Sequence, residues 1–334
     1  MMRIALDAMG GDHAPQPNID GAISALETLK ALEIVLVGNE TELERKLVEA
    51  GACRDRISVQ PADDVVGMAE KPTEALRLKP RSSINVCWEL MSNRQVDAIV
   101  SAGNTGAVVA SGLRKRLYLK QVRRPGIAVA LPTIKGRSVL MDVGANPTAR
   151  PEHLYQYAVM GAVYANQVLG IEDPKIGLMN IGSEDSKGNE LYRETHKLLT
   201  ESRLRDRYIG NIEGRGLYQG DADVLICEGF VGNVVLKVSE GMADFMMKTV
   251  AKEIIGNLNS EQDAARKTFQ ELGQQYHHSV AGGAPLLGID GICIICHGSS
   301  DTRSIANALQ VATTLKDREL NSHIADELAQ PLSS

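Results

Sequence analysis

The sequence lacks any apolar run long enough to span a membrane. A transmembrane helix needs roughly 20 consecutive apolar residues, and none of the 334 residues belongs to such a stretch. The N-terminus enters a predicted strand almost at once, so we expect no signal peptide. Together these absences predict a cytoplasmic protein.

Cysteines are few and scattered. The five of them, at positions 53, 87, 227, 293 and 296, are an odd number without regular spacing, which argues against a disulfide framework. They are typical of free, buried thiols in a reducing compartment. Cys293 and Cys296 match C-x-x-C only as text, because they lie in an apolar strand where residues three apart face opposite sides.

Several catalytic motifs are also absent. We find no H-E-x-x-H and no Cys/His cluster at zinc spacing, so no metal site is expected. Neither a G-x-S-x-G elbow nor a Walker A motif is present, and a covalent acyl-enzyme is not indicated. The first glycine turn does not match G-x-G-x-x-G, and we expect no cofactor.

Composition describes a globular protein. Charged residues make up 23% and hydrophobic residues 43% of the chain, enough for a large core in one domain or in two lobes. The net charge of -6 gives no support for nucleic-acid binding.

Short apolar strands alternate with amphipathic helices along the whole chain, which predicts an α/β protein with a mainly parallel sheet covered on both faces. Ten strands are expected, at 3–8, 33–37, 57–60, 96–101, 127–131, 138–143, 175–181, 207–212, 223–227 and 291–296. We also expect a helix from 234 to about 258 with a kink near Gly241. A glycine-rich linker should start at 282–283, and one helix should run from 303 to about 328.

Six of these strands end in glycine-rich polar turns, at 10–13, 103–106, 144–146, 182–188, 229–233 and 297–301. The active site of such a sheet lies at the carboxyl ends of its strands. Each turn alone is equally well explained by turn geometry, and Asp12 by a helix cap. Together the turns predict a polar cleft that holds one oxyanion, such as phosphate, and stabilises a second as it forms. The residues assigned to phosphate or substrate binding are Gly10, Gly11, Asp12, His13, Gly103, Asn104, Thr105, Gly106, Asn146, His297 and Ser299.

The chain resembles the PlsX family of bacterial phosphate acyltransferases. The resemblance rests on "RIALDAMGGDHAP" at 3–15, "SAGNTGA" at 101–107, "LMDVGAN" at 140–146, "NIGSEDSKGNEL" at 180–191, "EGFVGNVVLK" at 228–237 and "HGSSD" at 297–301. It implies a three-layer α/β/α fold related to isopropylmalate dehydrogenase and phosphotransacetylase. It also implies a homodimer and a transfer that needs no metal.

The activity that the resemblance implies is conversion of acyl-acyl-carrier-protein and inorganic phosphate to acyl phosphate and free carrier. The product feeds glycerol-3-phosphate acylation in phospholipid synthesis, and the membrane glycerol-3-phosphate acyltransferase is a further candidate partner. By the same likeness Lys187 and Asn233 are the catalytic residues. Phosphate, held by Lys187 and the turns at 10–13 and 103–106, would attack the thioester directly while Asn233 and nearby N–H groups stabilise the oxyanion. Asn233 has a structural alternative as a helix N-cap, and His13 and His297 either handle a proton or act as caps.

Three rival functions stay open at this point. They are an NAD-dependent decarboxylating dehydrogenase on the same architecture, a phosphotransacetylase acting on acyl-CoA, and a non-catalytic acyl-carrier or membrane scaffold. The first lacks a ribose-binding acid after a glycine fingerprint, and the polar strand ends argue against the last.

A basic segment follows the 103–106 turn and its helix. It contains six basic residues and no acid: Arg114, Lys115, Arg116, Lys120, Arg123 and Arg124. Acyl carrier proteins are strongly acidic, so the segment is a docking surface for the carrier, a solvated loop or a phosphate-facing cluster.

The family likeness also points to a helical dimerisation segment around 234–278. Met242, Phe245, Met246, Val250 and Ile254 lie along one side of the predicted helix. The 259–278 region is polar where some relatives have an apolar or basic hairpin, so peripheral association with the inner face of the membrane is left open.

Overall fold

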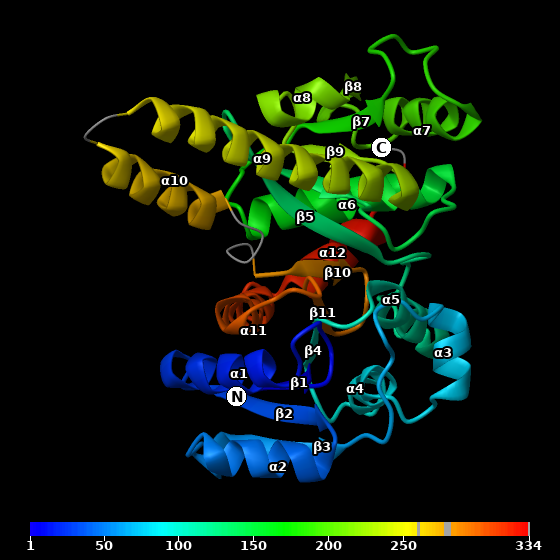
Figure 1. The fold of residues 1–334 in the computed structure, drawn as a ribbon. Helices are drawn as coiled ribbons and strands as arrows, with labels where there is room; N and C mark the ends of the chain where they lie inside the picture. Colours follow the sequence, from blue (N-terminus) through cyan, green and yellow to red (C-terminus); the bar gives the residue numbers. More distant parts are fainter. Residues whose placement is uncertain (259–260, 277–281, 333–334) are drawn as a thin grey trace.

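The computed structural model describes residues 1–258, 261–276 and 282–332, without the side chains of 273–276. Its eleven strands form one sheet in the order β3-β2-β1-β4-β11-β10-β5-β6-β9-β7-β8 (Figure 1). The strands are β1 Met2–Asp7, β2 Leu32–Gly38, β3 Ile57–Pro61, β4 Ala98–Ser101, β5 Gly126–Thr133, β6 Gly136–Met141, β7 Ile176–Asn180, β8 Tyr208–Glu213, β9 Val224–Ile226, β10 Ala284–Leu287 and β11 Ile292–Ile295.

Helices connect most of these strands. They are α1 Gln16–Thr28, α2 Glu40–Glu49, α3 Pro72–Leu78, α4 Ser83–Ser92, α5 Thr105–Lys115, α6 Pro151–Gln167, α7 Glu190–Glu201, α8 Gly214–Gln219, α9 Gly229–Asn257, α10 Gln262–Tyr276, α11 Thr302–Asp317 and α12 Leu320–Ala329, with a short 3₁₀ helix at Arg54–Arg56.

The sheet consists of two parallel halves joined through three antiparallel pairings. Strands β3, β2, β1, β4 and β11 run parallel and form the first half, and β6, β9, β7 and β8 run parallel and form the second half. Between them, β10 and β5 pair antiparallel with their neighbours. The two halves therefore run in opposite directions along the sheet.

Helices cover both faces of the sheet. Along β1, Ile4 and Leu6 belong to one buried apolar cluster and Ala5 to the other, as the alternation of a strand requires. The first cluster contains residues of α1, α2, α6, α7, α11 and α12. The second contains residues of α3, α4, α5 and α8, and partly buried residues of α9 pack against it. The predicted three-layer α/β/α architecture with a mainly parallel sheet is confirmed.

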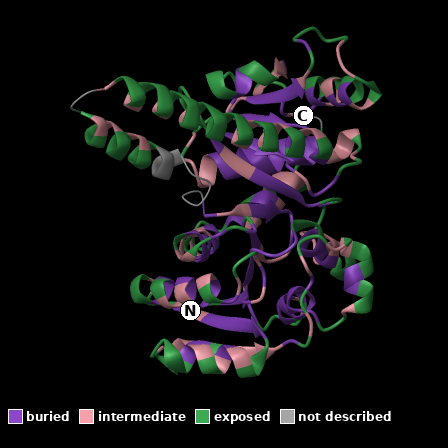
Figure 2. Cartoon of the chain, in the orientation of Figure 1, coloured by how far each residue is buried: buried purple, intermediate pink, exposed green. Residues whose placement is uncertain are grey.

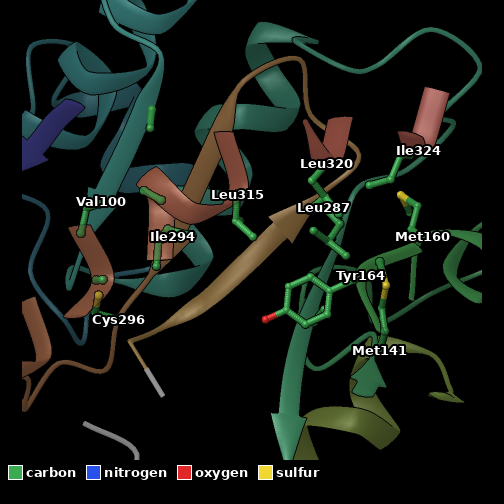
Figure 3. Close-up of a cluster of buried hydrophobic side chains, with 14 of the residues drawn as sticks. Val100, Met141, Met160, Tyr164, Leu287, Ile294, Cys296, Leu315, Leu320 and Ile324 are labelled. Atoms are coloured by element: carbon green, nitrogen blue, oxygen red, sulfur yellow. The ribbon is translucent and has the colours of Figure 1, made fainter. Parts of the chain in front are cut away.

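One of the two clusters runs without a break from the first half to the second. Figure 3 shows Ile294 of β11 and Leu287 of β10 in the same group as Met160 and Tyr164 of α6 and Ile324 of α12. Helix α12 packs on α6 although more than 150 residues separate their sequences. The C-terminal part of the chain thus fastens the two halves together.

Four expectations about individual elements were wrong. Strand β10 follows directly after the glycines at 282–283, where a linker was predicted. Helix α9 begins at Gly229 instead of 234 and continues through Gly241 without interruption. The predicted C-terminal helix is two helices, because Glu319 has a φ of 49° between α11 and α12. Cys53 is exposed, whereas the other four cysteines are buried as predicted.

Helix α9 is the least covered of the long helices. Figure 2 shows it mostly exposed along its length, above strands that are almost wholly buried. Within the part of the chain that the structure describes, no helix is long and apolar enough to cross a membrane.

Candidate functional site

The turns after β1 and β4 are held together by a buried carboxyl group. Asp7, the last residue of β1, is fully buried, and its Oδ2 accepts a hydrogen bond of 2.7 Å from Ser101 Oγ. Ser101 Oγ in turn accepts one of 3.1 Å from the Gly103 N–H. A Cβ added to Gly10 would lie 2.6 Å from Asp7 Oδ2 and 2.7 Å from the Gly103 nitrogen, so only glycine fits between them. Burial raises the pKa of Asp7.

Helix α5 begins at this junction with Asn104 as its N-cap. Asn104 Oδ1 accepts the Ala107 N–H at 3.0 Å, and its Nδ2 donates to the carbonyls of Gly67, Met68 and Glu70. The Asn104 side chain is therefore used within the protein. Thr105 and Gly106 are exposed at the first two positions of α5, where helix N–H groups have no intrahelical partner. These N–H groups and the Thr105 hydroxyl are the ones suited to an anion.

The turn after β11 lies against the turn after β1. The Asp12 N–H donates to the Gly298 carbonyl at 2.7 Å, and Gly11 has a φ of 114° that favours glycine. His297 Nδ1 lies 2.8 Å from Ser299 Oγ. Asp12 is not the cap of the following helix, because the N-cap of α1 is Pro15. Asp12, His13, His297 and Ser299 are all exposed.

A second buried carboxyl group organises the turn after β6. Asp142 Oδ1 accepts the N–H groups of Ile127, Gly144 and Ala145, and Oδ2 accepts the Asn146 N–H at 2.7 Å. Burial raises the pKa of Asp142, although these bonds oppose the shift. The Asn146 side chain is also consumed internally, since its Nδ2 lies within hydrogen-bonding distance of the Pro125 carbonyl, Asp142 Oδ2 and Tyr157 Oη. Asn146 thus builds the turn and offers no amide hydrogen to a substrate.

Helix α9 starts directly on this turn. Glu228 is its N-cap, and the carboxylate accepts the N–H groups of Phe230 at 2.6 Å and Val231 at 3.1 Å. A Cβ on Gly232 would lie 1.9 Å from the Asp142 carbonyl oxygen, so glycine is required there. Asn233 is exposed in the first turns of α9. Its side chain lies beside Gly144, where an added Cβ would be 3.7 Å from Asn233 Cγ. The alternative of Asn233 as an N-cap is therefore wrong.

Lys187 belongs to a loop that follows β7. Asn180 Nδ2 donates to the Lys187 carbonyl and to Asn211 Oδ1, and Asn211 donates to the Glu184 carbonyl, which fixes both ends of the loop. The stem of Lys187 crosses Gly182, where a Cβ would lie 2.9 Å from Lys187 Cγ. The ammonium nitrogen is 3.5 Å from Glu184 Oε1, and the side chain is 43% exposed. The backbone of Lys187 is thus held within the loop, and its partly exposed side chain pairs with Glu184.

The six turns form two groups that correspond to the two halves of the sheet. The turns at 10–13, 103–106 and 297–301 follow β1, β4 and β11, and those at 144–146 and 182–188 follow β6 and β7. Residues 229–233, which were predicted to be a turn, follow β9 as the start of α9. Adjacent strands twist by about 20–25°, so the five steps from β4 to β9 add up to roughly 100–125°. The accumulated twist reduces the angle between the strand directions of the two halves, which would be antiparallel in a flat sheet. In Figure 1, α5, the first turn of α9 and the loop between β7 and α7 all lie on the right of the molecule.

The basic segment lies at the far end of α5 from Thr105. Arg114 and Lys115 occupy its last turn and Arg116 is its C-cap. Helix α5 has 11 residues and is therefore roughly 16 Å long. All six basic residues are exposed. Arg123 Nη1 lies 4.0 Å from Glu152 Oε2 of α6, a weak surface pair.

Comparison with known proteins bears directly on this arrangement. The model of the family described as fatty acid synthesis protein matches residues 2–323. The chain belongs to this family. A relative named phosphate acyltransferase, from Desulfitobacterium hafniense strain Y51, is 44% identical over 331 residues, which are 98% of each chain. A phosphate acyltransferase of Heliobacterium modesticaldum is 46% identical over 93% of each chain.

Solved structures agree with the fold. A phosphotransacetylase from Streptococcus pyogenes superposes with a TM-score of 0.62 at 17% identity, covering 95% of this chain and 94% of its own. The EutD phosphotransacetylase from Staphylococcus aureus has a TM-score of 0.56 at 15% identity, covering 94% of each chain. As a member of the fatty acid synthesis protein family, the chain is an enzyme of the phosphate acyltransferase class. The dehydrogenase and the scaffold are not favoured.

Sequence reasoning did not single out Asp7, Asp142, Asn180 or Glu228. Each is a polar residue at the end of a buried strand or within two residues after it. Their position in the sequence could have identified them, because a carboxylate or amide at the end of a strand can accept hydrogen bonds from the N–H groups of the following turn.

Proposed function

We propose that this phosphate acyltransferase takes its acyl group from an acyl-acyl-carrier-protein and passes it to inorganic phosphate. The identity to phosphate acyltransferases over nearly the whole chain carries the proposal. An acyl-CoA donor is the second candidate, but the likeness to phosphotransacetylases is at 14–17% identity and speaks for the fold alone.

In the proposed reaction a phosphate oxygen attacks the thioester carbonyl carbon. The C–O bond forms, the carbonyl oxygen takes up negative charge, and the C–S bond then breaks to give acyl phosphate and the carrier thiolate. Phosphate is already an anion at neutral pH, so positioning and charge neutralisation matter more than a strong base. Exposed N–H groups at Thr105 and Gly106 support a phosphate site at the start of α5.

We assign the reacting carbonyl to Lys187 and Asn233. Both side chains are at least partly exposed, and both rest on glycines that leave room beneath them, Gly182 and Gly144. Lys187 supplies positive charge and Asn233 an amide N–H for the oxyanion. The exposed turns at 10–13 and 297–301 contribute His13, His297 and Ser299 on the phosphate side. Asn104 and Asn146 serve this site by holding turns instead of touching substrate.

The proposed assembly is a homodimer formed through α9 and α10. Met242, Phe245, Met246 and Ile254 of α9 are 56%, 59%, 47% and 44% exposed, an apolar surface that a second copy would cover. Residues 259–260 and 277–278 of the expected dimerisation segment lie outside the described residues. The proposal includes a cytoplasmic location and delivery of the acyl phosphate to glycerol-3-phosphate acylation in phospholipid synthesis, through the membrane acyltransferase.

The decisive assay is formation of acyl phosphate from phosphate and a matched pair of donors, acyl carrier protein and CoA with the same acyl chain. Turnover at least ten-fold more efficient with the carrier supports the proposal, and a preference for CoA contradicts it. Lys187→Ala should cut turnover by about 100-fold, the scale of losing an oxyanion partner. Lys248→Ala, which breaks a comparable exposed pair with Asp244, should leave turnover unchanged.

A further inference from the structure

Three large apolar side chains are exposed beside the proposed catalytic residues. Ile181, Phe230 and Val234 are 83%, 65% and 46% exposed, and we call them the apolar collar. Single exposed apolar residues are ordinary on protein surfaces, but grouped ones mark binding sites.

The sheet brings the collar together from two segments of the chain. Strand β7 pairs with β9 in parallel register, with Leu178 opposite Ile226. Strand β7 ends at Asn180 and β9 at Ile226, so Ile181 and the start of α9 at Gly229 both follow the same end of two neighbouring parallel strands. Val234 follows Phe230 by one helical turn on the same side of α9, since residues four apart in a helix are neighbours.

The same hydrogen bonds fix the collar and the proposed catalytic residues. Asn180 Oδ1 accepts the Ile181 N–H at 2.8 Å, and Asn180 Nδ2 donates to the Lys187 carbonyl. On α9, Phe230 and Val234 flank Asn233 in sequence, and Glu228 bonds the Phe230 N–H. Ile181 and Phe230 are therefore presented to solvent by firmly held backbone.

We propose that the apolar collar binds the fatty acyl chain of the donor. This rests on the proposed function, in which Lys187 and Asn233 hold the thioester carbonyl. The chain begins at that carbonyl carbon, so its first methylenes lie beside these two residues and the later methylenes of a long chain pass over the collar. Each methylene that such an apolar surface covers strengthens binding of the donor. The affinity rises by up to roughly four-fold for each methylene that is completely buried.

The collar should set how strongly the enzyme prefers long chains. We would measure kcat/KM with butyryl and palmitoyl donors on the same carrier for the wild type, Ile181→Ser and Phe230→Ser. Each variant should lose about ten-fold with palmitoyl, or about 1.4 kcal/mol, and less than two-fold with butyryl. The KM for phosphate should not change. Ile134→Ser is the matched control, since Ile134 is 77% exposed on the β5–β6 hairpin and should leave both donors unaffected.

Several results would overturn the inference. Equal losses with both donors would mean that the collar acts on the thioester group and not on the acyl chain. Unchanged palmitoyl kinetics in both variants would mean that the acyl chain binds at another surface. Loss of the dimer in Ile181→Ser and Phe230→Ser, seen by light scattering, would make the collar a subunit contact. A wild type that transfers no acyl group to phosphate would refute the proposed function and this inference together. An active wild type with the same chain-length profile as both variants refutes the inference alone.

Discussion

The interpretation of Asn233 depends on where the surrounding helix begins. It follows a glycine-rich stretch and was equally readable as a helix cap or as a donor to an oxyanion. The helix begins four residues earlier, with Glu228 as its cap, so the amide of Asn233 has no capping duty. The amide beside Gly144 is exposed, which supports its proposed role at the oxyanion.

Asn233→Asp should therefore lower turnover by about 100-fold with little change in stability, because it removes the N–H donor and adds a negative charge near the developing oxyanion. Turnover and melting temperature should be measured together. Asn39→Ala removes a true N-cap, on α2, and should show the reverse pattern, a loss of about 1 kcal/mol in stability with normal turnover. Wild-type turnover in Asn233→Asp would remove this residue from the mechanism.

Asp7 gives a prediction about pH. Burial raises its pKa above the ordinary value of 3.8, so the folded protein holds this proton more tightly than the unfolded chain does. Ionisation of Asp7 then costs the folded state stability, starting as the pH rises past 3.8 and complete above the raised pKa.

Asp7→Asn removes that cost while keeping an acceptor for Ser101. The melting temperature of the variant relative to the wild type should rise as the pH increases from about 4 to 7. Thermal unfolding of both proteins at a series of pH values measures this difference. Asp142 titrates in both proteins and cancels in the difference. Parallel melting curves across this range would show that the folded and unfolded proteins bind the Asp7 proton equally.

At the scale of elements, the strands were predictable and the start of α9 was not. Apolar runs such as 98–101 and 176–180 identify strands by themselves, and the glycines after them mark their ends. Gly229 and Gly232 look like turn residues in the sequence. They are helical because α9 packs directly on the carbonyls of Asn146 and Asp142, a contact across more than 80 residues that no local pattern contains.

The site divides in the same way. Exposed turn residues such as Thr105 and Lys187 were found because they stand in glycine-rich loops after strands. Asp142 was missed because its role depends on N–H groups from β5 and from its own turn at once. Strand β10 was missed because Pro285 and the glycines at 282–283 are typical of a linker, and because its partners, β5 and β11, are separated by almost half of the chain.

Helix α9 carries the prediction for subunit assembly. Met246 and Val250 are 47% and 37% exposed on the apolar side of the helix. Met246→Glu with Val250→Glu would bury four charges in a symmetric interface, which cannot form without large desolvation costs. Light scattering should show monomers. Lys248→Glu together with Lys252→Glu, placed among the same turns of α9, should still give dimers. A dimeric Met246→Glu, Val250→Glu protein would place the interface on another surface.

At the scale of the whole molecule, charge is distributed unevenly. The net charge is -6, yet all the charged residues from Arg114 to Arg124 are basic and exposed. It is separated from the start of α5 by the length of that helix. An acidic carrier could dock there while its acyl group extends toward the proposed site, and its encounter would be accelerated by the local field.

Changing Arg114, Arg116 and Arg123 to Ser should raise the KM for the carrier substrate about ten-fold and flatten its dependence on salt, because these charges are screened over a Debye length of about 8 Å. The KM for phosphate should stay the same. Arg45, Arg54 and Arg205, which lie in exposed ion pairs elsewhere, give a control with the same change in net charge when replaced by Ser. A rise in the KM for phosphate would instead assign the segment to the small anion.

The order of strands in the sheet also constrains how the protein can be made. The first half contains β11, which lies beside β4 although almost 200 residues separate them. While the ribosome is still synthesising the middle of the chain, β4 has an open edge and the turn at 10–13 lacks the Gly298 carbonyl that it will bond. The first half, although it leaves the ribosome first, is completed last. Its open edge is an aggregation hazard throughout synthesis, and a message truncated before β11 yields a chain in which neither the sheet nor the phosphate side of the site can close.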